Sequence, residues 1–286
     1  MRRWFVWAGV AVVAAIAAFY VRPVYVWLRS EAVLDRRYTL PRSLVRADLN
    51  AKAVARGARL VRLAGCTGCH GPDLTGKPLR DPVAIFASNL PVLTAATYSD
   101  EDFDRAIRRG LRPDASSLWV MPSFAYVYVR DADIAAILGY LRALKPQGAQ
   151  TPLPAFDHAA REKIARAELQ PEAELAQTQM PAVSLGPHYD GGRYIAMWSC
   201  GPCHGTELIG IGVAPDLRVV TRYSRHTFFN LMRRGWGAKK RRLKVMGPLA
   251  SQRFHILADW EIDPLYEYLT ARARAPKHVA VPAATR

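Results

Sequence analysis

Cysteine is scarce in this chain, which has 286 residues and only four cysteines. They fall in two segments, CTGCH at 66–70 and CGPCH at 200–204. Since these two segments use every cysteine, none remains for a structural disulfide. A scaffold that depends on disulfide bridges is therefore excluded.

A pattern of β-strands alternating with crossover helices is also missing. The segment WSCGPC at 198–203 is similar to a thioredoxin active site, but that motif requires such a pattern around it. A four-thiolate zinc site is another alternative, because it too uses paired C-x-x-C motifs. Zinc ribbons join their pairs by a short loop, whereas more than a hundred residues separate these pairs, and zinc leaves the histidine after each pair unexplained.

Acidic residues are absent between Leu217 and Ala258, where eleven lysines and arginines lie. The chain as a whole carries a formal net charge of +16, and this stretch supplies much of it. A run of one sign is commonly a solvated face. It can also attract an acidic protein or an anionic membrane surface, whereas an exported chain does not meet nucleic acid.

The pattern that both cysteine segments share, C-x-x-C-H, is the attachment sequence of a c-type haem. On a helix, residues three and four apart lie on one face, which places Cys66 and Cys69 beside each other with His70 turned the same way. Both thiols can then form thioether bonds to one haem while the imidazole reaches the iron. We therefore expect two covalently attached haem c groups, held by Cys66, Cys69, Cys200 and Cys203, with His70 and His204 as iron ligands.

The N-terminus carries an apolar run from Trp4 to Val21 that contains no charged residue. A run of this length can cross a bilayer, and aromatic residues stand at both of its ends, as interfacial anchors do. It predicts a transmembrane anchor at 1–28. The alternative is a cleaved signal peptide ending at Ala15-Ile16-Ala17. Either reading exports the chain. The retained anchor, which we favour, predicts the inner membrane as its location, with the haem domains on the periplasmic side.

Composition divides the rest of the chain into five parts. We expect a stalk at 29–50, a first domain at 51–145, a linker rich in Pro, Ala, Gln and Glu at 146–184, a second domain at 185–274 and a tail at 275–286.

Helical spacing and capping residues predict the main helices. In the first domain we expect helices at 53–63, from Ser99 to Gly110 and from Asp131 to Pro146, with loop between the haem motif and Ser99. The linker holds one expected helix at 159–169. The last helix of the second domain contains Tyr266, Tyr268 and Leu269.

The two expected domains repeat one plan. Gly57 and Gly191 precede their cysteine motifs by the same number of residues. An Arg-Arg-Gly sequence recurs at 108–110 and 233–235, and Met121 and Met246 follow these glycines at equal spacing. The repeat predicts two copies of one fold.

Met121 and Met246 are the candidates for the sixth ligand of each iron, on a loop before the final helix. A thioether is soft and favours reduced iron, although a lone methionine usually fills core space. Among the other candidates, Met197 and Met232 have core spacing and are expected to pack, and His158 and His188, in or beside the linker, are expected to be solvated. His226 and His255 could replace Met246, although the first domain has no counterpart to either. A backbone carbonyl usually orients the histidine that binds the iron. We expect the carbonyl of Pro215 to orient His204 in the second domain. In the first domain, either Pro82 or one of residues 87–90 could orient His70.

These features resemble class I cytochrome c of a dihaem, membrane-anchored type. The resemblance implies an all-α fold, with two tandem class I domains after a transmembrane helix. The first domain is similar to the cytochrome c subunits of membrane-bound sugar and alcohol dehydrogenases, at 87–90, 98–103, 108–110 and 121–124. Those subunits commonly carry three haems, whereas this chain has two motifs. The residues that the resemblance carries over are Cys66, Cys69, His70 and Met121, and Cys200, Cys203, His204 and Met246.

The resemblance implies an electron carrier without catalytic residues of its own. It would move single electrons between a membrane or periplasmic dehydrogenase, or a quinol-oxidising complex, and a terminal acceptor. The basic run at Lys239, Lys240, Arg241, Arg242 and Lys244 precedes Met246, so we expect an acidic redox partner near the second haem. The alternative is a dihaem enzyme, such as a peroxidase, in which one iron keeps an open site.

Overall fold

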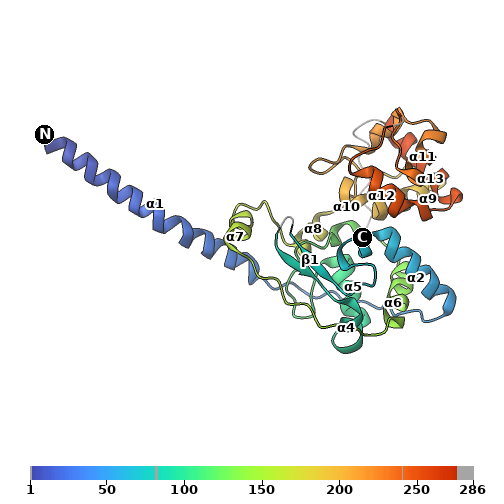
Figure 1. Ribbon diagram of the computed structural model, residues 1–286, viewed down its shortest axis with the longest axis horizontal. Helices are drawn as coiled ribbons and strands as arrows, with labels where there is room; N and C mark the ends of the chain where they lie inside the picture. Colours follow the sequence, from blue (N-terminus) through green and yellow to red (C-terminus); the bar gives the residue numbers. More distant parts are fainter. Residues whose placement is uncertain (1, 81–82, 240, 276–286) are drawn as a thin grey trace.

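The computed structural model describes residues 2–80, 83–239 and 241–275, which are mostly helical. We call residues 35–184 the first lobe and residues 185–275 the second lobe (Figure 1). In chain order the elements are α1 (Arg2–Leu34), α2 (Ala51–Ala64), α3 (Cys66–His70), β1 (Lys77–Leu79), β2 (Ile85–Ala87), α4 (Leu90–Ala96), α5 (Asp100–Arg109), η1 (Ser123–Tyr126), α6 (Asp131–Ala143), α7 (His158–Ala165), α8 (Glu172–Thr178), η2 (Pro187–Tyr189), α9 (Asp190–Ile195), η3 (Ala196–Cys200), α10 (Gly201–His204), η4 (Leu217–Arg222), α11 (Arg225–Arg234), α12 (Met246–Gln252), η5 (Phe254–Ile256) and α13 (Asp259–Arg274).

Helix α1 projects from the first lobe and passes without a break through Pro23 (Figure 1). Its second half packs against α7, where Arg22 contacts Glu162 at 2.8 Å and Glu31 contacts Arg161 at 2.5 Å. In the part of the chain that the structure describes, no helix is long and apolar enough to cross a membrane. The expected transmembrane anchor, and with it the location in the inner membrane, is therefore corrected. The helix extends beyond the expected anchor at 1–28: α1 continues to Leu34, and the part that contains Arg22 and Glu31 is paired with α7.

The segment expected as a stalk lies along the first lobe. After α1 ends at Leu34, Tyr38 Oη donates to Glu174 at 2.9 Å and Ala47 N donates to Asp100 at 2.8 Å. Val45 is buried in the core of that lobe. These contacts join the N-terminal segment to the lobe instead of lifting the lobe away from it.

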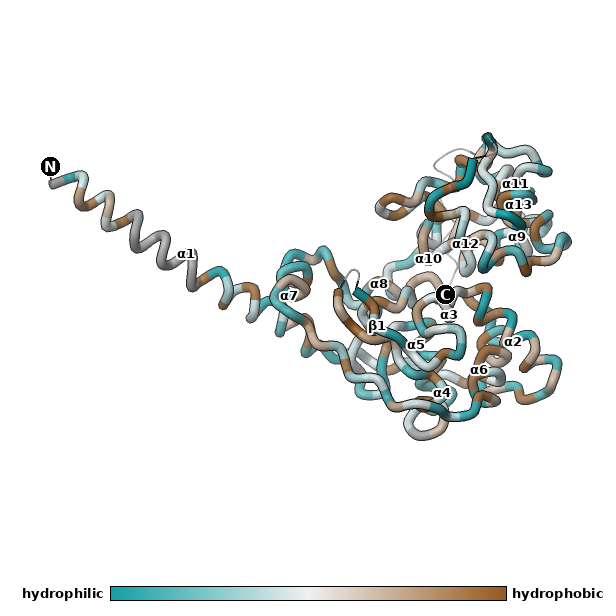
Figure 2. The backbone as a smooth tube through the Cα atoms, in the orientation of Figure 1, coloured by the Kyte–Doolittle hydropathy of each residue, from teal (hydrophilic) through white to brown (hydrophobic). Residues whose placement is uncertain are grey.

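Helices α2 and α6 form the centre of the first lobe. Figure 2 shows α6 in mostly apolar colours, whereas polar and apolar residues alternate along α2, as expected for an amphipathic helix on the surface. The two backbones touch at Gly57, where an added Cβ would lie 1.9 Å from the carbonyl oxygen of Ala136. Leu60 and Ile134 pack in the core on either side of this contact. The helices expected around 53–63 and from Asp131 are confirmed.

Helices α9 and α13 cross in the same way in the second lobe. There an added Cβ at Gly192 would lie 2.0 Å from the carbonyl oxygen of Pro264 and 2.9 Å from Tyr268 Cβ, while Gly191 has nothing within 4 Å. The structural counterpart of Gly57 is therefore Gly192, one residue later than the sequence spacing indicates. The two lobes also enter their motifs differently: the π-helix η3 leads directly into α10, whereas a left-handed glycine, Gly65, separates α2 from α3.

Three other features differ from the expectations. The segment between the first haem motif and Ser99 is not only loop: it contains α4 and the antiparallel pair β1–β2, in which Lys77 faces Ala87 and Leu79 faces Ile85. The linker holds α8 in addition to the expected helix, which is α7. Met246 begins the short helix α12, whereas a loop was expected there. Pro82, Lys240 and the tail from 276 lie outside the described residues.

The two lobes share one hydrophobic core. Tyr194 of the second lobe donates to Asp133 of the first at 2.6 Å, and Arg59 of the first lobe bonds to Glu261 of the second. These contacts hold the two cysteine motifs in fixed positions relative to each other.

Candidate functional site

The first cysteine motif forms the short helix α3, directly after a sharp turn at Gly65 with φ of 84°. His70 Nδ1 lies 2.8 Å from the carbonyl oxygen of Ser88. Ser88 is therefore the residue that orients His70, a choice that the sequence left open between Pro82 and residues 87–90. Burial lowers the pKa of His70, and the bond to Ser88 opposes that effect. The ring is therefore neutral, and since Nδ1–H donates to the carbonyl, Nε2 keeps the lone pair that an iron needs.

A cavity of about 800 Å³ adjoins this motif and is lined by Cys66, Cys69, His70 and Met121 together. Met121 lies in irregular chain just before η1, as expected. Most of the remaining wall is apolar, from Leu93, Trp119 and their neighbours. The fold thus brings together all four residues that the sequence assigns to the first site.

The second motif spans the end of η3 and α10. His204 Nδ1 lies 2.8 Å from the carbonyl oxygen of Pro215, which is the residue that the sequence predicted. Burial lowers the pKa of His204, while Pro215 and Asp216 oppose that effect. The ring is held like that of His70, although the chain reaches it through a different turn.

A second cavity, of about 770 Å³, is lined by Cys200, Cys203, His204 and Met246. Met232, which was expected only to pack in the core, also lines it, whereas Met197 is buried in the core and is not part of the wall. Figure 1 places α10, α11 and α12, which supply most of these residues, together in the second lobe.

The four remaining candidate histidines are all solvent-exposed. His226 bonds to Asn230 at 2.9 Å, and neither His226 nor His255 is among the residues that line the second cavity. His158 and His188 lie near Glu162 and Glu267, at 3.9 Å and 3.7 Å. Their exposure agrees with the expectation that the linker histidines are solvated.

The first cysteine of each motif has a raised thiol pKa. Burial raises the pKa of the Cys66 thiol to about 11, with a partial opposing effect from the charge of Arg253. Burial also raises the pKa of Cys200, against a hydrogen bond from Ser199 and the charge of Arg253. A raised pKa disfavours the thiolate, which argues against dithiol redox chemistry.

The residues present fit a c-type haem in each cavity. Each site offers two thiols for thioether bonds, an imidazole oriented by a carbonyl, a thioether sulfur and an apolar wall large enough for a prosthetic group. A c-type haem in such a site supplies an iron that takes up and releases one electron.

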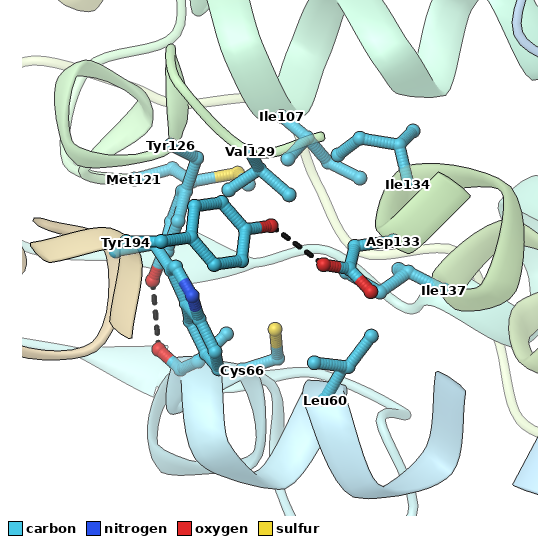
Figure 3. A pocket seen from close by; sticks show the side chains of 12 residues that line it. Leu60, Cys66, Ile107, Met121, Tyr126, Val129, Asp133, Ile134, Ile137 and Tyr194 are labelled. Atoms are coloured by element: carbon cyan, nitrogen blue, oxygen red, sulfur yellow. Dashed lines mark hydrogen bonds between the residues drawn. The ribbon is translucent and has the colours of Figure 1, made fainter. Parts of the chain in front are cut away.

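Sequence reasoning missed several residues that support the first site. Tyr126 Oη donates to the carbonyl of Ala64, next to the motif, at 2.7 Å. A small apolar cavity lies beside Cys66 and Met121, and Tyr194 and Trp198 of the second lobe line it. Figure 3 shows the Tyr194 ring reaching to Asp133 in this cavity. No sequence motif identifies these residues, because a tyrosine or tryptophan comes to line a site only through the packing of distant segments.

Glu172 of α8 supports the segment that follows Met121. Its Oε2 accepts from Phe124 N at 3.4 Å, and its own N–H donates to Leu118 at 3.0 Å. Burial raises the pKa of Glu172 to about 8, against the backbone donors of Phe124 and Ser123. The linker also supplies residues 150–154 to the wall of the first cavity, so it does more than connect two lobes.

Comparisons with known proteins agree with these sites. Residues 54–145 match the cytochrome c family. The gluconate 2-dehydrogenase cytochrome c subunit of Pantoea cypripedii is 29% identical over 180 residues, which are 56% of this chain and 40% of that protein. The fructose dehydrogenase cytochrome subunit of Gluconobacter japonicus is 29% identical over 178 residues, which are 55% of this chain and 36% of that protein. The Cbb3-type cytochrome c oxidase subunit CcoP of Helicobacter pylori is 33% identical over 104 residues, which are 36% of this chain and 32% of that protein.

The matched part of this chain thus spans less than half the length of these relatives. Two of them are named as cytochrome subunits of a dehydrogenase, and the third as a subunit of a cytochrome c oxidase. The cytochrome c family implies covalently bound haem c in the matched domain.

Proposed function

Since residues 54–145 form a cytochrome c domain, we propose that the chain is a dihaem electron carrier built from two tandem domains of this kind, at 51–145 and 185–274. Cys66 and Cys69 would hold one haem, with His70 and Met121 as iron ligands. Cys200 and Cys203 would hold the other, with His204 and Met246 as ligands. The observation that supports this proposal is that each lobe brings two thiols, one imidazole and one thioether to the wall of a single cavity.

The partner we propose is a dehydrogenase or a quinol-oxidising complex, from which electrons pass to a terminal acceptor. The relatives support this choice because their names place them in gluconate and fructose dehydrogenases and in an oxidase. The chain's own residues bind and orient the two groups, and apolar side chains keep water from them. Two sites that each offer a methionine as the sixth iron ligand suit electron transfer in which no substrate binds to the iron.

The mass and absorption spectrum of the exported protein test this function. We expect a mass increase of two porphyrins that survives denaturation, because thioether bonds are covalent, and a low-spin spectrum in both oxidation states. A mass increase of one porphyrin would contradict the second site. A high-spin ferric band, or rapid binding of cyanide by the isolated protein, would instead indicate an open site of the kind that a peroxidase needs.

We further propose that an acidic redox partner docks beside the second cavity. Lys239 and Arg241 line this cavity and are exposed, and Arg242 and Lys244 next to them are exposed as well. The guanidinium of Arg242 lies 5.4 Å from the centre of the Trp236 ring, which places its charge over that ring. The cavity mouth also exposes Val213 and Val245. Cations around an apolar rim are a surface that guides an acidic partner and then contacts it.

Charge reversal at this surface should slow electron exchange with an acidic partner. We expect Lys239→Glu with Arg241→Glu to lower the second-order rate constant by about tenfold or more at low salt and to flatten its dependence on ionic strength. Stopped-flow oxidation by an acidic redox protein measures both effects. Lys52→Glu with Lys145→Glu, two exposed positions of the first lobe, is the control with the same change in net charge. Equal slowing in both variants would show that net charge, not this surface, attracts the partner.

A further inference from the structure

Arg253 follows α12 and joins the backbone around one cysteine motif to the backbone around the other. Its Nε donates to the carbonyl of Leu63, close to Cys66, and its Nη2 donates to the carbonyl of Ser199, next to Cys200, at 3.1 Å. An added Cβ at Gly65 would lie 2.9 Å from Arg253 Nη1. The guanidinium therefore lies against the residues that lead into both motifs.

The two large cavities adjoin at this point. Arg253 lines both of them, and so do Cys203 and Leu249. Of these three residues, Arg253 carries a permanent charge, because a guanidinium stays protonated in proteins. A single fixed cation is thus shared by the two sites.

The charge of Arg253 is not neutralised locally. In the described part of the chain, its hydrogen bonds go to backbone carbonyls, and its guanidinium packs over the Phe254 ring at 4.9 Å. Arg59, which also joins the lobes, differs in both respects: it is paired with Glu261 and lines neither large cavity. An unpaired, half-buried charge acts over several ångströms with less screening than an exposed one.

We infer that Arg253 is a positioning residue shared by the two haem sites, which fixes the two motifs relative to each other and raises the reduction potential of the iron at both. The inference rests on the proposed function, since it needs two haems. Ferric iron carries one more positive charge than ferrous iron, so a nearby cation disfavours the ferric form. Because the same charge acts on both sites, the two potentials rise together, and the driving force between them changes little.

Potentiometric titration of the purified full chain with redox mediators, followed by absorbance, tests this inference. We expect Arg253→Gln to lower the ferrous-to-ferric ratio at each haem by about tenfold. For a one-electron couple this equals a fall of about 59 mV in each midpoint potential. Arg253→Lys keeps the charge and loses the planar fork, so it should leave both potentials closer to those of the parent protein while weakening the link between the motifs.

The matched control removes an interlobe contact at constant net charge. Arg59→Gln combined with Glu261→Gln deletes another arginine link between the lobes, and we expect it to leave both potentials in place. If Arg253→Gln moves neither potential or only one, or if the control moves both equally, the inference is wrong. Mass spectrometry keeps this separate from the proposed function. A variant with two bound porphyrins and unmoved potentials overturns the role of Arg253 alone, whereas a parent protein with fewer than two porphyrins overturns the dihaem assignment.

Discussion

Replacing Met246 with alanine is expected to abolish the absorption band of the iron–thioether bond at one haem and to lower one of the two midpoint potentials. Loss of the soft sulfur removes the ligand that favours ferrous iron. Axial ligands set haem potentials over a range of about 0.8 V, so we expect a fall on the order of 100 mV or more. Met121→Ala should produce the same change at the other haem. Spectroelectrochemistry on each variant measures both quantities.

Met232 provides the control for this experiment because it lines the same cavity and is buried. Met232→Leu conserves volume and should leave the band and both potentials unchanged. Loss of the band in that variant, with retention in Met246→Ala, would reassign the ligand to Met232. Unchanged potentials in all three variants would show that no methionine binds iron.

The second large effect concerns stability. Gly57→Ala should lower the free energy of unfolding by about 3 kcal/mol, because the new methyl group would lie 1.9 Å from the Ala136 carbonyl oxygen and 2.9 Å from Tyr140 Cβ. Neither neighbour can move easily, since one is helix backbone and the other lies where two helices cross. A loss of this size corresponds to roughly 10 °C in the unfolding midpoint of a chain this long. Denaturant titration followed by circular dichroism checks it.

The adjacent glycines Gly191 and Gly192 of the second lobe test the same explanation, because we expect their replacement by alanine to have opposite effects on stability. Gly192→Ala should cost as much as Gly57→Ala, because its methyl group would meet the Pro264 carbonyl at 2.0 Å. Gly191→Ala, one residue earlier in α9, should instead stabilise the protein by about 0.5 to 1 kcal/mol, since it has open space and an improved helix propensity. If Gly191→Ala is the damaging change, the second lobe follows the sequence spacing and our assignment of Gly192 is wrong.

Local signals explain which parts of the fold the sequence could predict. Ser99 and Asp102 form the expected capping box of α5, and Gly110 ends that helix in the left-handed conformation. The cysteine motifs predicted their own sites because attachment chemistry requires those residues within one helical turn. Pro215 could be foreseen for the same reason, as it lies a short loop after His204.

The parts that could not be predicted depend on contacts between distant segments. The Ser88 carbonyl reaches His70 because β2 and Asn89 place it there, and the Asn89 side chain is fixed by Val92 N and by the carbonyls of Gln147 and Ala149. Strands as short as β1 and β2 carry no periodic pattern. The apolar run of the N-terminus was misread because hydrophobicity alone does not show that the helix continues to Leu34 and that Arg22 and Glu31 pair with α7.

Tyr194 and Trp198 complete the wall of the small cavity beside Cys66, although they are made more than a hundred residues later. During synthesis, the N-terminal half therefore emerges with this flank of its own motif open. The later arrival of the second lobe closes it, and Tyr194 then bonds to Asp133. The surroundings of Cys66 are thus complete only when residues 194–198 have been made and have packed against the first lobe.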